Sequence, residues 1–292
     1  MDQTLNPVII QLNGGLGNQM FQYAFGRALA LKRHAPLFLD LRAFKNDPLR
    51  DYALNTFNLQ AREADEKLLV RYKPSLVQKI WAKLKLPGSL NSQIYAEKEF
   101  CFDPKIALNN KAQYFIGYWQ TEKYFAGQET EIRRDFEIKP EYLVGVQDFL
   151  KAMQNTDSIS LHIRRGDYVS NSHTNTFHGV CSMDYYQKAL NLALEGTTNP
   201  HLYIFTDDPE WARKETTWPV PTVIVSGQGL TDIQEFYLMT QVKKNIIANS
   251  SFSWWAAWLN SKAQVFCPAK WFGNAGHDTK DLIPERWIKV GQ

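Results

Sequence analysis

Few cysteines and no long apolar segment occur among the 292 residues of this sequence. Its three cysteines, Cys101, Cys181 and Cys267, are odd in number and far apart, which argues against a disulfide framework or a zinc cluster and fits a reducing cytoplasm. Apolar runs such as Val8–Leu12 and Ile246–Ala248 are far shorter than the ~20 residues of a membrane-spanning helix. The first residues also lack the basic and apolar regions of a signal peptide. We therefore expect a cytoplasmic location.

An excess of charge of one sign is absent as well. Lysines and arginines number 33 against 30 aspartates and glutamates, and the net charge of +3 is too small to indicate nucleic acid as a partner. The sequence has no Asp-x-Asp pair that would chelate a metal–diphosphate complex, no His-Glu-x-x-His motif and no pattern of a Ser-His-Asp triad. We therefore expect no metal cofactor and no nucleic-acid partner.

The composition is that of a globular protein, with 44% hydrophobic and 22% charged residues. At roughly 150 residues per domain, the chain is long enough for two domains, and a single large core is the alternative. Aromatic residues reach 13%, with 9 Trp, 13 Tyr and 17 Phe. Such side chains either build cores or offer apolar faces to ligands, and composition alone does not separate the two uses.

Strand-like and helix-like segments alternate along the chain. Apolar runs at Val8–Leu12 and Leu37–Asp40 enclose a glycine-rich loop and a helical stretch, and the same alternation restarts at Ile159–Ile163. Because Pro140 to about Asn155 has a helical pattern that closes the first half, we predict two α/β domains with the boundary at residues 155/156. Their open parallel sheets should face each other across a cleft, with ligands bound at the carboxyl ends of the strands.

Glycines separate the first predicted strand from the first predicted helix in the segment NGGLGNQ. Glycine permits positive φ and close approach of the backbone, and a helix N-terminus favours anions. A nicotinamide or flavin site would require a third glycine where Met20 stands, and a tight turn without a ligand is also open. The residues that we assign to ligand binding in this loop are Gly14, Gly15, Gly17, Asn18 and Gln19.

Two adjacent arginines follow the strand Ile159–Ile163. Alternation along the strand predicts His162 and Arg164 on the face opposite to Leu161. Two guanidinium groups side by side require an anion or Asp167 to neutralise them, and arginine binds phosphate oxygens in pairs. We therefore expect a diphosphate at Arg164 and Arg165, with a surface salt-bridge cluster as the alternative.

Polar residues follow two further predicted strands. Asp207 and Asp208 stand where a strand ends and a helix begins, so one carboxylate can cap the helix while the other binds a base or a ribose. Ser250, Ser251 and Phe252 also lie at a helix start, where hydroxyl and backbone N–H groups can bind an anion. Together with the glycine loop, these strand-end residues predict a nucleotide-diphosphate donor held in the cleft.

Residues 61–90 contain seven basic side chains against three acidic ones. Leu76, Ile80, Trp81 and Leu84 would share one face of a helix there. One interpretation is a surface helix packed on the first domain. The other is peripheral contact of the basic helix around Trp81 with an anionic membrane surface, which would place the protein at the inner membrane.

Four motifs in order, GGLGNQMFQYAFGRALA, HIRRGDYV, FTDD and IIANSSFSWWAAWL, resemble those of the family 11 glycosyltransferases, the α-1,2-fucosyltransferases. The resemblance extends from about Val8 to Trp271. It implies a GT-B-like fold, inversion at the anomeric carbon, no metal requirement and transfer of fucose from GDP-β-L-fucose to the 2-hydroxyl of a terminal galactose. Mammalian members carry an N-terminal membrane anchor that is not evident here, which favours a bacterial enzyme of surface-glycan or O-antigen biosynthesis.

The resemblance also distributes roles among the candidate residues. The family pattern HxRR-x-D falls on His162, Arg164, Arg165 and Asp167. The arginines and the Ser250–Phe252 turn would then stabilise the leaving diphosphate. Asp207 or Asp208 would bind guanine or ribose. The fucosyl-phosphate would be contacted by Asn18, Gln19 and the glycine loop.

The motifs say less about the general base and about how the acceptor sugar is bound. Asp167 is the first candidate for the general base, with His178 and His173 as rivals, and Asp167 can instead orient the arginines. The aromatics near Trp119 and Tyr124 are our candidates for stacking on a sugar. The acceptor itself would be a galactose-terminated oligosaccharide or a lipid-linked glycan. The alternatives are a transferase for another nucleotide sugar and a carbohydrate-binding protein without activity.

Overall fold

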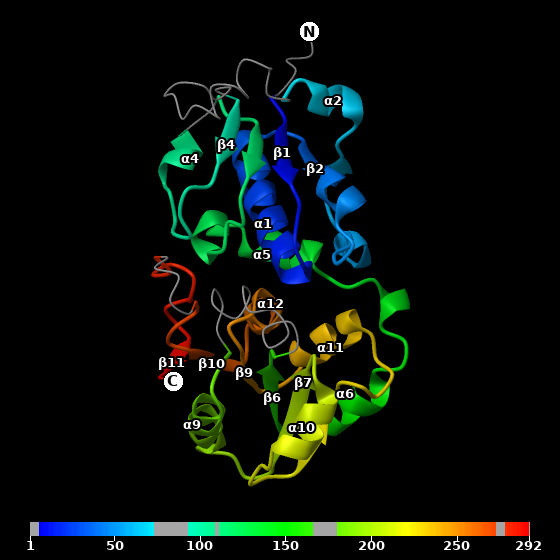
Figure 1. The fold of residues 1–292 in the computed structure, drawn as a ribbon, viewed down its shortest axis with the longest axis vertical. Helices are drawn as coiled ribbons and strands as arrows, with labels where there is room; N and C mark the ends of the chain where they lie inside the picture. The colour runs from blue at the N-terminus through cyan, green and yellow to red at the C-terminus, as the bar shows by residue number, and fades with distance from the viewer. Residues whose placement is uncertain (1–5, 73–92, 109–110, 166–179, 273–277, 292) are drawn as a thin grey trace. The chain divides into compact units, whose positions relative to one another are not determined.

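The structure is a computed structural model that describes residues 6–72, 93–108, 111–165, 180–272 and 278–291. It contains two compact α/β units (Figure 1). The first unit comprises residues 1–137 together with 280–282, and the second comprises residues 138–279 together with 283–292.

A parallel sheet of five strands forms the centre of the first unit, in the order β3-β2-β1-β5-β4. The chain builds the sheet outward from β1 through β2 to β3, crosses to the opposite edge with β4, and then adds β5 between β4 and β1. The carboxyl ends of β1 and β5 therefore mark the point where the strand order reverses, which is where open α/β sheets bind ligands. The strands are β1 (Val8–Gln11), β2 (Leu37–Asp40), β3 (Arg62–Glu63), β4 (Ile94–Ala96) and β5 (Tyr114–Ile116).

The long helix α1 (Leu16–Arg33) packs on this sheet with most of its side chains buried. Gly26 lies where helix and strand approach most closely, since an added Cβ would lie 2.3 Å from Cγ1 of Ile10. The shorter helices of the first unit are η1 (Arg42–Asn46), η2 (Leu54–Thr56), α2 (Glu66–Val70), α4 (Lys105–Leu108), η3 (Glu122–Phe125) and α5 (Glu129–Asp135).

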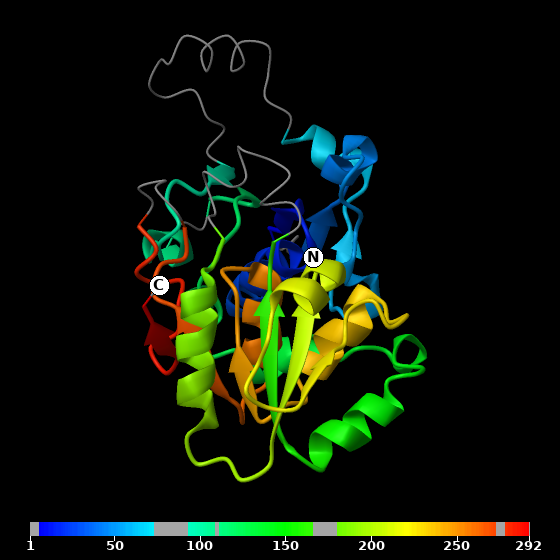
Figure 2. The same ribbon diagram turned by 60° about the horizontal axis from the view of Figure 1, so that its bottom comes forward.

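Six parallel strands form the sheet of the second unit, in the order β11-β10-β9-β6-β7-β8. This is the strand order of a dinucleotide-binding sheet, and its reversal lies between β6 and β9. Figure 2 shows β6 and β7 side by side and pointing in the same direction. The strands are β6 (Asp157–Ile163), β7 (Pro200–Thr206), β8 (Thr222–Ile224), β9 (Lys244–Ile246), β10 (Gln264–Pro268) and β11 (Ile288–Val290).

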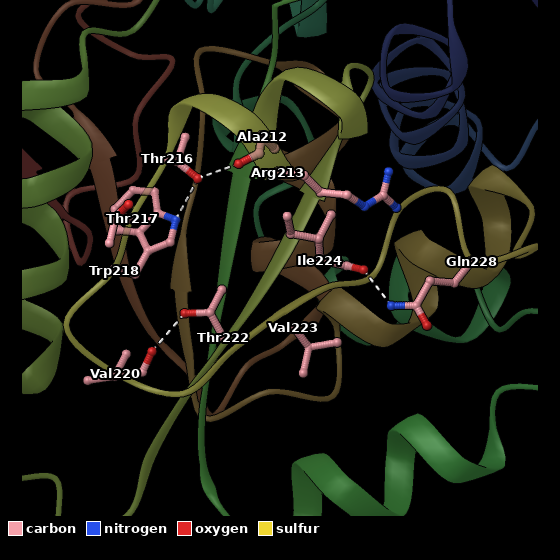
Figure 3. A pocket seen from close by; sticks show the side chains of 10 residues that line it. All are labelled: Ala212, Arg213, Thr216, Thr217, Trp218, Val220, Thr222, Val223, Ile224 and Gln228. Carbon is pink, nitrogen blue, oxygen red and sulfur yellow. Dashed lines mark hydrogen bonds between the residues drawn. The ribbon is translucent and has the colours of Figure 1, made fainter.

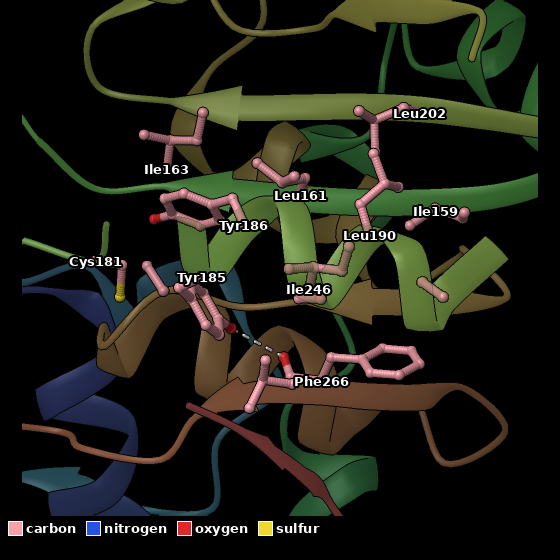
Figure 4. Packing of buried hydrophobic residues seen from close by; sticks show 14 of the residues in the cluster. Ile159, Leu161, Ile163, Cys181, Tyr185, Tyr186, Leu190, Leu202, Ile246 and Phe266 are labelled. Atoms are coloured by element: carbon pink, nitrogen blue, oxygen red, sulfur yellow. Dashed lines mark hydrogen bonds between the residues drawn. The ribbon is translucent and has the colours of Figure 1, made fainter. Parts of the chain in front are cut away.

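The core of the second unit forms between β6 and α9 (Met183–Leu194), as Figure 4 shows. Leu161 and Ile163 point into this cluster, where Tyr185 and Tyr186 of α9 are fully buried. The hydroxyl of Tyr185 donates a hydrogen bond of 2.6 Å to the carbonyl of Ile247. The other helices of the unit are η4 (Pro140–Tyr142), α6 (Gln147–Gln154), α10 (Pro209–Glu215), α11 (Asp232–Met239) and α12 (Ser251–Leu259).

The helix expected at residues 140–155 is divided into η4 and α6. The interruption includes Gly145, whose φ of +92° is incompatible with a continuous right-handed helix. Because α6 packs against β6, residues 138–155 belong to the second unit, whereas the sequence pattern placed them with the first.

Candidate functional site

Arg164 and Arg165 follow β6 at the carboxyl edge of the second sheet, beside the end of β7. The Nε atom of Arg164 lies 3.1 Å from Oδ2 of Asp207, and the backbone N–H of Arg165 donates to Oδ1 of the same carboxylate at 2.8 Å. The guanidinium of Arg165 lies 4.3 Å above the ring of Trp211 and 3.9 Å from Asp208. The charges of the two arginines are thus balanced by carboxylates from the neighbouring strand end. Both arginines remain partly exposed.

Asp208 performs the capping role that the sequence suggested for one of the two aspartates. Its Oδ1 atom accepts a hydrogen bond of 3.1 Å from the backbone N–H of Trp211 in the first turn of α10. Its own N–H donates to Oγ1 of Thr206 at 3.1 Å. Asp207, by contrast, holds Arg164 in place and shares the edge of the sheet with it.

His162 lies on the opposite face of β6 from Leu161 and Ile163, as the alternation predicted. It is buried, and its ring packs at 5.7 Å from the ring of Phe252. Burial, together with the positive charge of Arg164, lowers the pKa of His162 to about 3. The imidazole is therefore neutral at physiological pH. Its Nδ1 atom makes no hydrogen bond within the structure described.

Helix α12 begins just after β9, next to the end of β6. Ser250 occupies the N-cap position in an extended conformation, but its side chain makes no capping hydrogen bond. Ser251 and Phe252 form the first turn and are partly exposed. Backbone N–H groups at such a helix start, together with the helix dipole, favour a negative charge.

A partly buried carboxyl group that the sequence did not reveal supports the end of β7. Ser226 accepts a hydrogen bond of 2.8 Å from the backbone N–H of Thr206 and donates one of 2.6 Å to Oε2 of Glu235. The pKa of Glu235 is raised to about 7, mainly by burial and also by the negative charge of Asp232. The hydrogen bond from Ser226 acts in the opposite direction. This chain of contacts fixes the backbone directly before Asp207.

In the first unit, the glycine loop is held by amide side chains. Gly14 adopts a φ of +75°, and the side chain of Asn18 lies against it. Gln19 is completely buried: its Nε2 atom donates to the carbonyls of Gly14 at 2.8 Å and Asp51 at 2.9 Å, and Oε1 accepts from Ala53 at 3.0 Å. The Gln19 amide therefore fixes the conformation of the loop. Contact between Gln19 and a ligand stays a prediction.

Two glutamines that the motif reasoning passed over join the glycine loop to the segment after β5. Gln22 donates to the carbonyl of Gly117 at 3.0 Å and accepts from the N–H of Asn13 at 3.0 Å. Nε2 of Gln120 donates to Oδ1 of Asn18 at 2.9 Å. Asn18 therefore lies where the strand order of the first sheet reverses.

Glu97, which follows β4, is a second carboxyl group with an unusual environment. Its oxygens accept hydrogen bonds from the backbone N–H groups of Tyr118 at 2.6 Å and Trp119 at 3.1 Å. Burial raises the pKa of Glu97 to about 7 despite these hydrogen bonds, which act in the opposite direction. Gly117 permits this approach, since a Cβ there would lie 2.4 Å from Cβ of Glu97.

The prediction that the aromatics near Trp119 and Tyr124 stack on a sugar was wrong for both residues. Trp119 is completely buried, stacked at 4.1 Å on Phe25, and Tyr124 is 7% exposed. A positive φ of 57° at Trp119 turns its side chain into the core. The exposed ring in this segment is that of Tyr118, at 36%. The three tryptophans of the segment Trp254–Trp258 are also buried and belong to the core of the second unit.

A surface pocket on the second unit lies between α10, β8 and the loops around them (Figure 3). Its polar groups largely satisfy one another: Thr216 donates to the carbonyl of Ala212 at 2.7 Å, and Trp218 donates to Thr216 at 3.0 Å. None of the residues predicted for the site line this pocket. We therefore do not assign the chemistry to it.

Several expectations concern residues outside the described part of the chain. Asp167, His173 and His178, the candidates for the general base, are among them, as is the segment around Trp81. Within the described ranges, no cluster of metal-ligating side chains is found. In those same ranges, none of the helices combines the length and apolar character needed to cross a membrane.

The sequence matches the model of the family described as Glycosyl transferase family 11 over residues 4–289. The chain belongs to this family. Two relatives of this family 11 glycosyltransferase come from Escherichia coli. An α-1,2-colitosyltransferase is 33% identical over 98% of this chain and 99% of the relative. The O-antigen biosynthesis glycosyltransferase WbnK is 33% identical over 96% of this chain and 99% of the relative.

More distant likenesses extend to fucosyltransferases. The mouse galactoside 2-α-L-fucosyltransferase Sec1 is 27% identical over 52% of this chain and 43% of its own length. Among solved structures, the chain resembles the NodZ α-1,6-fucosyltransferase from Bradyrhizobium in a crystal soaked with GDP-fucose. The TM-score is 0.51 at 14% identity, and the match covers 87% of this chain and 92% of NodZ. The structural likeness confirms the expected GT-B-like fold of two Rossmann-like α/β units.

Proposed function

We propose that this family 11 glycosyltransferase transfers L-fucose from GDP-β-L-fucose to the 2-hydroxyl of a terminal galactose, forming an α-1,2 linkage with inversion. The observation that carries the proposal is the pair of oriented, partly exposed arginines at the edge of the second sheet. There Arg164 and Arg165 follow β6, Asp207 positions Arg164, and α12 begins without a side-chain cap after β9. These groups meet at the reversal of a dinucleotide-type sheet, where nucleotides bind.

The chemistry of this edge suits a departing nucleoside diphosphate. The acceptor oxygen forms a bond to C1 of fucose while the bond from C1 to the phosphate oxygen breaks and its electron pair leaves with GDP. The negative charge that grows on the β-phosphate would be stabilised by the arginines and by the N–H groups at the start of α12. Since the ion pair with Asp207 already orients Arg164, little rearrangement is required during the reaction.

Several finer assignments belong to the same proposal. Positive charge from Arg164 and Arg165 would take the place of a metal ion, so transfer should continue in EDTA. Asp207 or Asp208 would bind guanine or ribose, and Asn18 with the glycine loop would contact the fucosyl-phosphate. Asp167, or one of the histidines in the same segment, would accept the proton of the attacking hydroxyl.

The acceptor we propose is a galactose-terminated oligosaccharide, free or linked to a lipid. The O-antigen relative supports a surface glycan as the product. Peripheral contact of the basic segment around Trp81 with an anionic membrane would bring the enzyme to a lipid-linked acceptor. Sedimentation with anionic vesicles at low salt tests this contact, and failure to sediment would contradict it.

A second candidate function is transfer of colitose, because a relative with this activity is 33% identical over 98% of the chain. Colitose is fucose without its 3-hydroxyl group, so the two donors differ at one position on the sugar. A site that hydrogen-bonds the 3-hydroxyl would reject GDP-colitose, whereas an apolar site there would discriminate weakly. Comparing kcat/KM for the two donors at a fixed acceptor concentration distinguishes these functions.

The deciding experiment measures GDP binding by calorimetry and fucose transfer to β1,3- and β1,4-linked galactosides, with and without EDTA. Arg165→Ala should abolish transfer and weaken GDP binding while leaving the fold intact. The matched control is Arg286→Ala, which also removes a guanidinium near a tryptophan ring in the second unit, at 5.9 Å from Trp287, but before the amino end of β11.

Three results would contradict the proposal. Unchanged transfer by the Arg165 variant would remove the diphosphate assignment. Galactoside binding without any affinity for GDP would indicate a carbohydrate-binding protein. Loss of transfer in EDTA, restored by a divalent cation, would overturn the metal-independent mechanism.

A further inference from the structure

An aromatic surface pair lies beside the reversal point of the first sheet. The ring of Tyr118, just after β5, is 36% exposed and stacks on the ring of Phe100, with 6.1 Å between centroids and 12° between the planes. A flat pair of this kind offers an apolar face that presents partial negative charge. Such a face suits the weakly positive C–H groups on one side of a hexose ring.

A carboxylate lies directly next to this platform. Both oxygens of Glu97 are anchored by the backbone N–H groups of Tyr118 and Trp119, and each oxygen has two lone pairs. Glu97 is only partly buried, so acceptor positions remain for hydroxyl donors. Gly117 is the residue that permits this arrangement, because any side chain there would collide with Glu97.

A third group, in the same turn, is a side-chain oxygen without a hydrogen-bond donor. Oε1 of Gln120 is buried and makes no hydrogen bond in the described part of the chain, while its Nε2 atom is held by Asn18. Gln120 is 8% exposed. A buried carbonyl oxygen without a donor costs free energy, and a ligand hydroxyl would satisfy it.

From these observations we infer that the turn Gly117–Gln120, with Glu97 and Phe100, is the subsite for the acceptor hexose. The Tyr118 ring stacks on the apolar face of the sugar, Glu97 accepts hydrogen bonds from its hydroxyls, and Gln120 accepts one more. Combined aromatic and carboxylate recognition is specific for a neutral, hydroxyl-rich ligand. A nucleoside diphosphate would find no cationic side chain among these residues.

This inference rests on the proposed transferase function for its biological meaning, but its central claim is a binding site that can be tested without the donor. Saturation-transfer NMR with lactose and methyl β-galactoside should detect binding to the wild-type protein. Tyr118→Ala and Glu97→Gln should each weaken that binding about tenfold, which corresponds to ~1.4 kcal/mol per site. Tyr118→Phe, which keeps the ring, should bind almost as the wild type does.

Kinetics with both substrates supply the second measurement. The Tyr118→Ala variant should raise KM for the galactoside about tenfold while KM for the donor and affinity for GDP remain at wild-type values. Tyr142→Ala, which removes a partly buried ring from the second unit, serves as the matched control. Unchanged GDP affinity and circular dichroism show that each variant is folded.

The outcomes separate this inference from the proposed function. Galactoside binding that depends on Tyr118, in a protein that transfers no fucose, would support the subsite and overturn the proposed transfer. Transfer with an unaltered acceptor KM in both variants would overturn the subsite and support the transfer. A wild-type protein that neither binds nor fucosylates galactosides would overturn both.

Discussion

Charged side chains at the ends of β6 and β7 are organised in pairs that lie far apart in the sequence. Ile163 is opposite Thr206 in the parallel register, so the next residues on each strand, Arg164 and Asp207, become neighbours. The resulting ion pair joins partly exposed groups, and its contribution to stability is therefore small. Its main effect is to hold the guanidinium in one orientation at the edge where we propose the diphosphate.

Glu235 provides a prediction at the residue scale, because its pKa is raised to about 7 from the ordinary value of 4.5. Between these two values the folded protein holds one more proton than the unfolded chain. The contribution of Glu235 to stability is therefore complete below pH 4.5 and is lost as the pH rises through 7. The full change in the free energy of unfolding is on the order of 3 kcal/mol, and screening by solvent reduces it.

Urea unfolding at pH 5, 6, 7 and 8 checks this prediction. In Glu235→Gln the loss of stability between pH 5 and 8 should be smaller than in the wild type, because the amide keeps an acceptor for Ser226 but carries no charge. Glu210→Gln, an exposed residue of α10, is the control and should follow the wild-type curve. Identical pH dependence of wild type and Glu235 variant would contradict the assignment.

At the scale of the element, α1 shows how close helix–strand packing positions the glycine loop. In the glycine motif of dinucleotide-binding sheets, the third glycine lets the helix pack closely on the strand, and Met20 stands at that position here. Gly26, further along α1, permits the close helix–strand packing instead. Its position brings α1 against Ile10 of β1 and within reach of Leu37 of β2. The helix start, where Gly14 and Asn18 lie, is thereby fixed relative to the carboxyl end of β1.

Gly26→Ala should destabilise the first unit by about 1–2 kcal/mol. The new Cβ would lie 2.3 Å from Ile10, and the cost of overpacking exceeds the ~1 kcal/mol that alanine contributes as a better helix former. Chemical denaturation measures the difference. Gly291→Ala, where nothing lies within 4 Å of the added atom, should be close to neutral.

A double variant tests the stated cause of this effect. Adding Ile10→Ala to Gly26→Ala should cost less than the sum of the two single changes, because the smaller residue makes room for the methyl group. Strict additivity would show that the destabilisation has another origin.

At the scale of the whole molecule, the chain divides into two units that are not continuous in sequence. Residues 280–282 belong to the first unit although they lie near the end of the chain. Asp281 attaches this segment by accepting a hydrogen bond of 3.0 Å from the N–H of Phe102 and by pairing with Nζ of Lys123 at 2.5 Å. Leu282 is buried beside it.

Asp281→Ala should loosen this attachment and cost about 1–2 kcal/mol, because the N–H of Phe102 loses its acceptor and a half-exposed ion pair is removed. Hydrogen exchange should show faster exchange at Phe102 and in residues 280–282. Glu285→Ala changes an exposed acid just after this segment, in the second unit, and should leave exchange unaltered. Equal exchange in the two variants would contradict this role of Asp281.

Much of the fold could be predicted because its signals are local. Runs of apolar residues located β1, β2 and β6. Strand β11, of three residues, was not anticipated, because so short a segment carries too little pattern. The break at Gly145 was also missed, since glycine inside a helical pattern does not by itself reveal its φ.

The sequence alone determined the class of fold, the family and the positions of the candidate loops at the strand ends, because periodicity, glycine placement and the strand-end motifs are written in consecutive residues. Tertiary structure decided which residues meet. Only the parallel register of β6 and β7 brings Asp207 to Arg164, 43 positions away. Only the backbone at Trp119 buries that ring and leaves Tyr118 exposed beside Glu97. Contacts of this kind depend on packing between distant segments, which local pattern does not contain.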